Sequence, residues 1–139
     1  MYKNEHMFSI AICKAMKNNK MHPVQIETGL TQQGVPDLFV MTGDGDVWVE
    51  LKNMPYTNKS VSYEIQWRPG QQAWHSIYYK KHGKRKYVIT VVALNVGYII
   101  IQMTKLWDNN IVSCDDTIYV KQLHDVVIYI KEIGDGNRI

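Results

Sequence analysis

Apolar side chains recur at helical spacing near the start of the chain. They occupy Phe8, Ala11, Ile12, Ala15 and Met16. This spacing predicts an amphipathic helix that begins after Asn4, a suitable N-cap, and ends near Asn18–Asn19. Glu5 lies three residues before Phe8, so we expect it to project from the buried face, where a carboxylate needs a cation or hydrogen bonds. Alternatively, as a first-turn acid, Glu5 only complements the helix dipole.

Strand patterns follow in the next part of the chain. Apolar and polar residues alternate in His22–Thr28, which predicts a first strand. Pro36–Met41 and Val47–Lys52 predict the two strands of a hairpin, because the Gly43–Asp46 segment between them is a strong turn sequence. The link Gly29–Gly34 between the first strand and the hairpin is polar and bounded by glycines.

The second half of the chain predicts a loop, a helix and more strands. Residues 53–66 are polar and rich in turn formers, which predicts a long loop. Pro69 at the first helical position and a stop at Gly83 predict a helix. Tyr87–Leu94 and Val96–Met103 predict a hairpin buried in the sheet. For Thr117–Glu132, a strand and a short helix fit, although the periodicity leaves this open. In that helix the inward residues are expected to be Val126, Val127 and Ile130.

The order of these elements predicts an α/β fold with a mixed central sheet flanked by helices, because the hairpin makes part of the sheet antiparallel. The 139 residues and ordinary globular composition favour a single domain over 1–139 and exclude a collagenous or disordered chain. Cys13 and Cys114 are too few for a disulfide framework, and no zinc-binding spacing occurs. Charged residues interrupt the N-terminal stretch, so we expect no signal peptide and no membrane partner. A cytoplasmic protein is expected, in the host cell if the source is viral.

Three residues of the predicted hairpin lie where they could act together. Asp37 begins one strand, while Glu50 and Lys52 lie near the end of its partner, so antiparallel pairing brings them to one edge of the sheet. Two carboxylates repel each other unless a hard cation such as Mg²⁺ or Mn²⁺ lies between them. Lys52 could then orient or deprotonate a water that attacks a phosphodiester. The alternative is that all three are ordinary solvated residues.

The same residues carry a resemblance to a known superfamily. Pro36-Asp37, a Gly/Asp turn and Glu50-Leu51-Lys52 resemble the signature of the PD-(D/E)xK nucleases. The flanking segments Gln25-Ile26-Glu27 and Arg68–His75 resemble the small phage-type VRR-NUC and Holliday junction resolvase-like endonucleases. The resemblance covers residues 5 to about 94 and implies a restriction-endonuclease-like core that hydrolyses DNA with the help of Mg²⁺ or Mn²⁺.

This resemblance also implies roles for individual residues. Asp37 would be the bridging metal ligand, Glu50 the second ligand and Lys52 the catalytic lysine. The main-chain carbonyl of Leu51 would be a further ligand. Glu5 would complete or support the metal site, in agreement with its expected inward face.

Other matches to the family are less specific. Gln71 corresponds to the family's helix glutamine and would contact water, Lys52 or DNA; the alternative is a surface residue. Glu27 would line the site only because its flanking segment is similar, and otherwise it is a polar strand residue. The segment Thr28–Gly34 lacks the serine of archaeal junction resolvases, with only threonines available as substitutes. Residues 104–139 carry no matching motif.

Positive charge is concentrated between Lys59 and Lys86. Seven cations and one acid give this segment +6, whereas nine cations and twelve acids give the rest −3. The candidate DNA-binding residues are Arg68, Lys80, Lys81, Lys84, Arg85 and Lys86. This cluster exceeds what a helix C-terminus needs to complement its dipole, which favours phosphate binding. Aromatic residues such as Tyr78-Tyr79 are expected in a core or interface rather than in base stacking, given their helical spacing.

Together these features favour a metal-dependent endodeoxyribonuclease, and the resemblance alone suggests branched substrates such as the Holliday junctions of DNA recombination. Since so short a chain could hardly enclose a branched duplex, we expect a homodimer with two active sites. One alternative is a catalytically silent nuclease fold that only binds DNA, although such a protein has no reason to keep a repulsive carboxylate pair. Another is a sequence-specific restriction or nicking enzyme, which would need recognition elements that this chain lacks.

Overall fold

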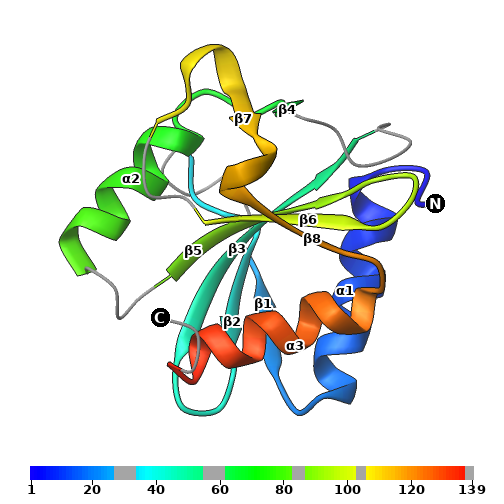
Figure 1. Ribbon diagram of the computed structural model, residues 1–139. Coiled ribbons are helices and arrows are strands. Elements are labelled where there is room, and N and C mark those ends of the chain that lie inside the picture. The colour runs from blue at the N-terminus through cyan, green and yellow to red at the C-terminus, as the bar shows by residue number, and fades with distance from the viewer. Residues whose placement is uncertain (27–33, 55–61, 83–86, 103–105, 137–139) are drawn as a thin grey trace.

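The computed structural model describes residues 1–26, 34–54, 62–82, 87–102 and 106–136. Its elements in chain order are α1 (Glu5–Asn18), β1 (His22–Gln25), β2 (Leu38–Met41), β3 (Asp46–Asn53), β4 (Ser62–Glu64), α2 (Gln71–His82), β5 (Tyr87–Ala93), β6 (Tyr98–Gln102), β7 (Ile111–Ser113), β8 (Thr117–Val120) and α3 (Leu123–Gly134). Figure 1 shows a central sheet with α1 and α3 on one side and α2 with β4 and β7 on the other. No described helix is long and apolar enough to span a bilayer.

The central sheet has six strands in the order β1-β2-β3-β5-β6-β8. β3 and β5 pair in parallel, and the other neighbours pair antiparallel. A parallel pair needs a long crossover, and the segment that contains α2 supplies it. This arrangement confirms the predicted mixed α/β fold with helices flanking the sheet.

Both predicted hairpins are present, with small differences at their ends. β2 and β3 pair from Met41↔Asp46 to Leu38↔Val49, and β5 and β6 pair antiparallel as expected. β2 begins at Leu38 rather than Pro36, which leaves Asp37 just outside the strand. Of the strand predicted over residues 22–28, β1 covers His22–Gln25. Residue 26 is not part of the strand, and residues 27 and 28 lie outside the described residues.

The two faces of the sheet have separate cores. Inward side chains of β3 such as Val49 pack with Phe8 of α1 and with the predicted inward residues of α3. On the other face, Ile99 of β6 packs with Tyr63 of β4 and Val112 of β7. α1 is capped as predicted, because the Asn4 side chain accepts a hydrogen bond from the Met7 N–H. The prediction of a strand and then a helix near the C-terminus is also confirmed.

Two sequence predictions about local structure are wrong. The predicted loop over residues 53–66 contains β4, whose central residue Tyr63 is buried. α2 begins at Gln71 instead of Pro69, because Gly70 has φ of 85° and a left-handed residue cannot continue an α-helix.

Candidate active site

Asp37 lies where β2 and β3 separate. The last pair of the two strands is Leu38↔Val49, and beyond it the Asp37 Oδ2 atom accepts a hydrogen bond from the Leu51 N–H at 2.9 Å. The side chain thus replaces the backbone partner that a longer β2 would have supplied. Since the N–H and C=O of a strand residue point to the same side, the Leu51 carbonyl also faces the Asp37 side of β3. This edge therefore combines a carboxylate with a main-chain oxygen.

Glu50 and Lys52 lie on the face of β3 that α2 covers, and both are buried, at 0% and 3% exposed. The Lys52 Nζ is 3.4 Å from the Glu50 Oε2. The structure therefore excludes the alternative in which these two are ordinary solvated residues. Burying them is costly unless each charge is paired and hydrogen-bonded, and the partners come from α2 and the segment before it.

Gln71 connects these charges. It is 2% exposed, and its Nε2 donates to the Glu50 Oε2 at 2.8 Å. Its Oε1 accepts from the Lys52 Nζ at 3.0 Å and from the Arg68 N–H at 2.7 Å. The alternative of a surface glutamine is excluded by this burial. Gln71 holds the lysine and the carboxylate in a fixed relation, as a positioning group would.

Arg68 lies over the two carboxylates. Its Nη2 is 3.5 Å from the Asp37 Oδ1 and 3.7 Å from the Glu50 Oε2. The side chain is 54% exposed, so these are screened ion pairs that release easily. Arg68 was predicted to bind DNA, and the structure places it at the carboxylate edge.

The environment of Glu50 disfavours its charged form. Burial, followed by the nearby Asp37 carboxylate, raises the pKa of Glu50 from its ordinary 4.5 to about 7. Lys52, Gln71 and Arg68 oppose this shift. The Glu50 Oε1 is buried and has no hydrogen-bond partner among the described residues. A strongly shifted pKa beside an unsatisfied carboxylate oxygen is typical of functional sites.

Glu5 lies at the mouth of the site. Glu5 was expected on the buried face of α1, and the residue is exposed. Even so, Glu5 lines a cavity of about 220 Å³ together with Asp37 and Leu51. Partial burial is the main reason why the pKa of Glu5 is raised; Lys52 lowers it and Asp37 raises it.

These groups fit a divalent cation with few protein ligands. Among the described residues, no three acidic, histidine or cysteine side chains form a cluster that could hold a metal. Mg²⁺, however, is commonly bound by only one or two carboxylates with water and phosphate oxygens. Asp37 and Glu50 share the single cationic group of Arg68, and one Glu50 oxygen lacks a partner. The donor set of carboxylate and carbonyl oxygens therefore suits Mg²⁺ or Mn²⁺.

The other predicted residues lie apart from this edge. Lys80 and Lys81 are exposed in the last turn of α2, at the end of the helix opposite Gln71. Lys84, Arg85 and Lys86 lie outside the described residues, as does Glu27.

His75 belongs to the same buried layer, although the sequence interpretation did not single it out. It is 0% exposed, and neither ring nitrogen has a hydrogen-bond partner among the described residues. Burial, followed by the positive charge of Lys52, lowers the pKa of His75 to about 3. Its spacing of four residues from Gln71 was the available signal, because such pairs share a helix face.

Comparison with known proteins identifies the fold. The sequence matches no known protein-family profile and no curated protein. The structure is similar to Hjc from Archaeoglobus fulgidus, described as a Holliday junction resolvase from an archaeal hyperthermophile. The TM-score is 0.50 with 10% identity, over 86% of this chain and 90% of that chain. At this identity the likeness concerns the fold alone, a mixed α/β fold similar to that of this resolvase.

Proposed function

We propose that this protein is a metal-dependent endonuclease that hydrolyses DNA phosphodiesters, with Asp37, Glu50 and Lys52 at its catalytic centre. The observation that carries the proposal is the buried Glu50–Gln71–Lys52 network beside Asp37. A fold does not determine a function, whereas a specific set of side chains supports one. Burying a lysine and a carboxylate lowers the stability of the fold. A nuclease needs both groups for catalysis, which gives a reason to bury them despite this cost.

Each residue has a separate task in this proposal. Asp37, Glu50 and the Leu51 carbonyl would hold the cation, and Glu5, which lines the same cavity as Asp37 and Leu51, would support it. When bound, Mg²⁺ or Mn²⁺ supplies Lewis-acid activation of water and neutralises phosphate charge. Lys52, held by Gln71 at 3.0 Å, orients the attacking water. The exposed Arg68 side chain leaves the two carboxylates and pairs with a DNA phosphate instead.

We further propose that the substrate is branched DNA and that two copies of the chain act together. The support is the fold shared with a Holliday junction resolvase and the small size of the chain. A homodimer presents two sites related by symmetry, which suits paired cuts. Sedimentation velocity is expected to give twice the 16.2 kDa chain mass, and a monomer at the concentrations that support junction cleavage would contradict the dimer.

The direct test is cleavage with defined substrates. Purified protein with Mg²⁺ or Mn²⁺ is expected to cut branched DNA, a four-way junction or a flap, in preference to a linear duplex of the same sequence. Asp37→Ala and the isosteric Glu50→Gln should abolish cutting. Asp44→Ala, in the turn of the same hairpin, is the control and should cut normally. Retained cleavage in Asp37→Ala would refute the site.

One observation favours a second candidate, a DNA-binding module without activity. The Arg68 guanidinium already lies within ion-pair distance of both carboxylates. The same assay separates the two functions: binding to DNA without cleavage of any substrate in either metal would favour the module.

A further inference from the structure

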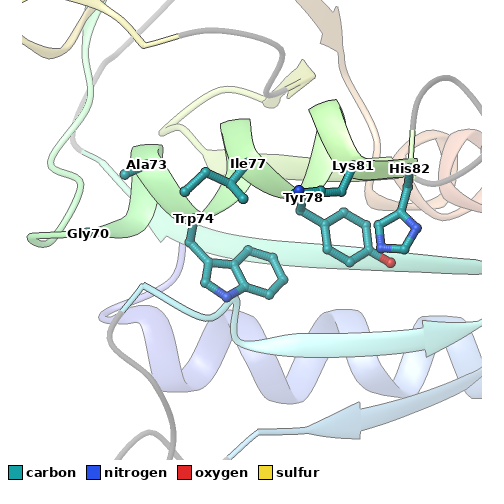
Figure 2. Close-up of a pocket in the computed structure, with 7 residues that line it drawn as sticks. All are labelled: Gly70, Ala73, Trp74, Ile77, Tyr78, Lys81 and His82. Carbon is teal, nitrogen blue, oxygen red and sulfur yellow. The ribbon is translucent and has the colours of Figure 1, made fainter.

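Aromatic rings form a row along α2, as Figure 2 shows. Trp74 and Tyr78 are stacked, with ring centroids 5.2 Å apart and an interplanar angle of 14°. Tyr78 in turn contacts His82, with centroids 4.4 Å apart. The three residues occur at every fourth position and so share one helix face. We call Trp74, Tyr78 and His82 the aromatic row.

The aromatic row lies between the sheet and the surface. Trp74 and Tyr78 pack edge-on against Trp48 of β3, with ring centroids 5.4 and 6.3 Å apart, which agrees with the core or interface role expected for Tyr78. Trp74 and Tyr78 are only half-buried and His82 is exposed. The row lines a cavity of about 440 Å³ together with Ala73, Ile77 and Lys81. Gly70, which has no side chain, lies at the start of this cavity. The volume is in the range of sites for nucleotide-sized ligands.

The charge around the aromatic row indicates what kind of partner it accepts. Residues 65–86 contain no acid, and the last turn of α2 carries Lys80 and Lys81. Arg68 lies two residues before Gly70. Two copies of this face would bring like charges together, whereas a polyanion is attracted. Flat rings flanked by cations are the combination that binds single-stranded nucleic acid, in which rings contact bases and cations contact phosphates.

We propose that the aromatic row is a stacking platform for unpaired bases of the DNA substrate. This inference rests on the proposed function for the identity of the nucleic acid and narrows the substrate to DNA with unstacked nucleotides. A fully paired duplex cannot use the platform, because its base faces are already stacked. Ring stacking also accepts any base, so the platform selects DNA structure rather than sequence.

The position of the platform suits this role. Gly70 follows Arg68, which lies over the Asp37 and Glu50 carboxylates. Trp74 comes about one helical turn later, and the row extends roughly 12 Å farther to His82. Unpaired nucleotides on the row would therefore lie directly beside the strand whose phosphate enters the carboxylate edge.

The test measures base stacking in the wild-type protein with a chelator present, so that no strand is cut. Oligonucleotides carry 2-aminopurine, a base whose fluorescence is quenched by stacking. Quenching is expected when the base is unpaired, in a single strand or a gapped duplex, but not when it is paired. Trp74→Ala should weaken binding to the unpaired substrates about tenfold more than binding to paired duplex. Trp74→Phe should restore most of this preference, and Ile118→Ala, an exposed apolar residue on β8, is the control without effect.

Several outcomes would overturn the proposal. Equal quenching of paired and unpaired bases, or equal loss on both kinds of DNA, would show that the row does not stack on bases. A shift from dimer to monomer in Trp74→Ala would show that a second copy covers the row. His82→Ala removes an exposed ring with little risk to folding and should change the preference in the same direction. If the protein cuts DNA but does not quench 2-aminopurine, the stacking platform is rejected and the nuclease function stands. If it quenches 2-aminopurine but cuts no DNA in any metal, the nuclease function is rejected and the platform stands.

Discussion

At the scale of single residues, the candidate site depends on how Glu50 is surrounded. Its carboxylate is fully buried beside Asp37, and its two oxygens differ. Oε2 accepts a hydrogen bond from the Gln71 amide, while Oε1 has no hydrogen-bond partner among the described residues. Burial and the second carboxylate raise the pKa of Glu50 to about 7. Ionised Glu50 therefore costs the metal-free protein stability at neutral pH.

This cost predicts a pH-dependent effect of Glu50→Gln. The pKa of Glu50 is raised in the folded state, so the protonated carboxyl favours folding. This stabilisation is fully present below pH 4.5 and is lost as the pH rises through about 7. Glutamine cannot ionise, so the variant should gain up to about 3 kcal/mol over wild type between pH 4.5 and pH 8. Denaturant unfolding at both pH values, with a chelator present, measures the difference. Parallel pH profiles for the two proteins would contradict the shifted pKa.

Gln71 allows a second test at this scale, because its neighbour is a matched control. Gln71→Ala should lower the unfolding free energy by about 1–3 kcal/mol, since it removes one hydrogen bond from each of the buried Glu50 and Lys52 side chains. It should also slow cleavage at least tenfold. Gln72→Ala removes bonds to Asn110 and Trp107 instead, so it should lower stability while cleavage stays normal. Equal rates for the two variants would assign Gln71 a structural role only.

The sequence predicts some of these residues better than others. Strand alternation and a short turn place Asp37 opposite the Glu50–Lys52 segment, and the register follows that expectation. The position of Arg68 depends on the turn through Gly70, which local patterns do not specify. Glu5 was expected inside because helical periodicity gives the direction of a side chain but not whether another element covers it.

At the scale of elements, the backbone just before α2 packs directly against the segment that precedes β2. Gly34 has φ of 93°, and a Cβ atom there would collide with the Gly70 carbonyl. This close approach joins the segment that leads to Asp37 with the segment that leads from Arg68 to Gln71. Two glycines thereby hold the two halves of the candidate site together.

A pair of glycine substitutions separates this contact from backbone strain. Gly34→Ala and Gly136→Ala both place alanine at positive φ, but a Cβ at Gly136 meets nothing within 4 Å. Both should lose about 1 kcal/mol to the strained backbone, and Gly34→Ala should lose about 1–3 kcal/mol more because of the collision. Only Gly34→Ala should also slow cleavage. Unfolding and cleavage measured on both variants test this, and equal losses would mean that the contact is unimportant.

Element prediction from the sequence succeeds where a pattern is long enough to show a period. The helix at the N-terminus and both hairpins were predicted on this basis. β4 and β7 were not, because three residues do not establish an alternation. Their pairing joins residues about fifty positions apart, which depends on the tertiary fold covering one face of the sheet.

At the scale of the whole molecule, the sheet separates two tasks. α1 and α3 cover one face of the sheet and α2 lies over the other (Figure 1). α2 carries Gln71, His75 and the aromatic row. The net charge of +3 is the sum over a cationic segment and an acidic edge at the start of β2. A phosphate backbone along α2 would approach the carboxylates only when a cation compensates for their charge.

This compensation predicts that divalent cations stabilise the whole fold. A ligand that binds only the folded state adds about 2.7 kcal/mol at one hundred times its Kd, so Mg²⁺ and, more strongly, Mn²⁺ should raise the Tm of wild type. The rise should be larger at pH 8 than at pH 5, because Glu50 must lose its proton to bind metal and its pKa lies near 7.

Variants assign this stabilisation to the carboxylate edge. Glu50→Gln and Asp37→Asn should show little metal-dependent rise in Tm, whereas Asp44→Ala should respond as wild type does. Arg68→Ala should respond at lower metal concentration, since the guanidinium competes with the cation for both carboxylates. Differential scanning calorimetry across a metal titration measures each case without any DNA present. An equal rise in wild type and Glu50→Gln would place the cation elsewhere and would leave Arg68 as the permanent partner of the two carboxylates.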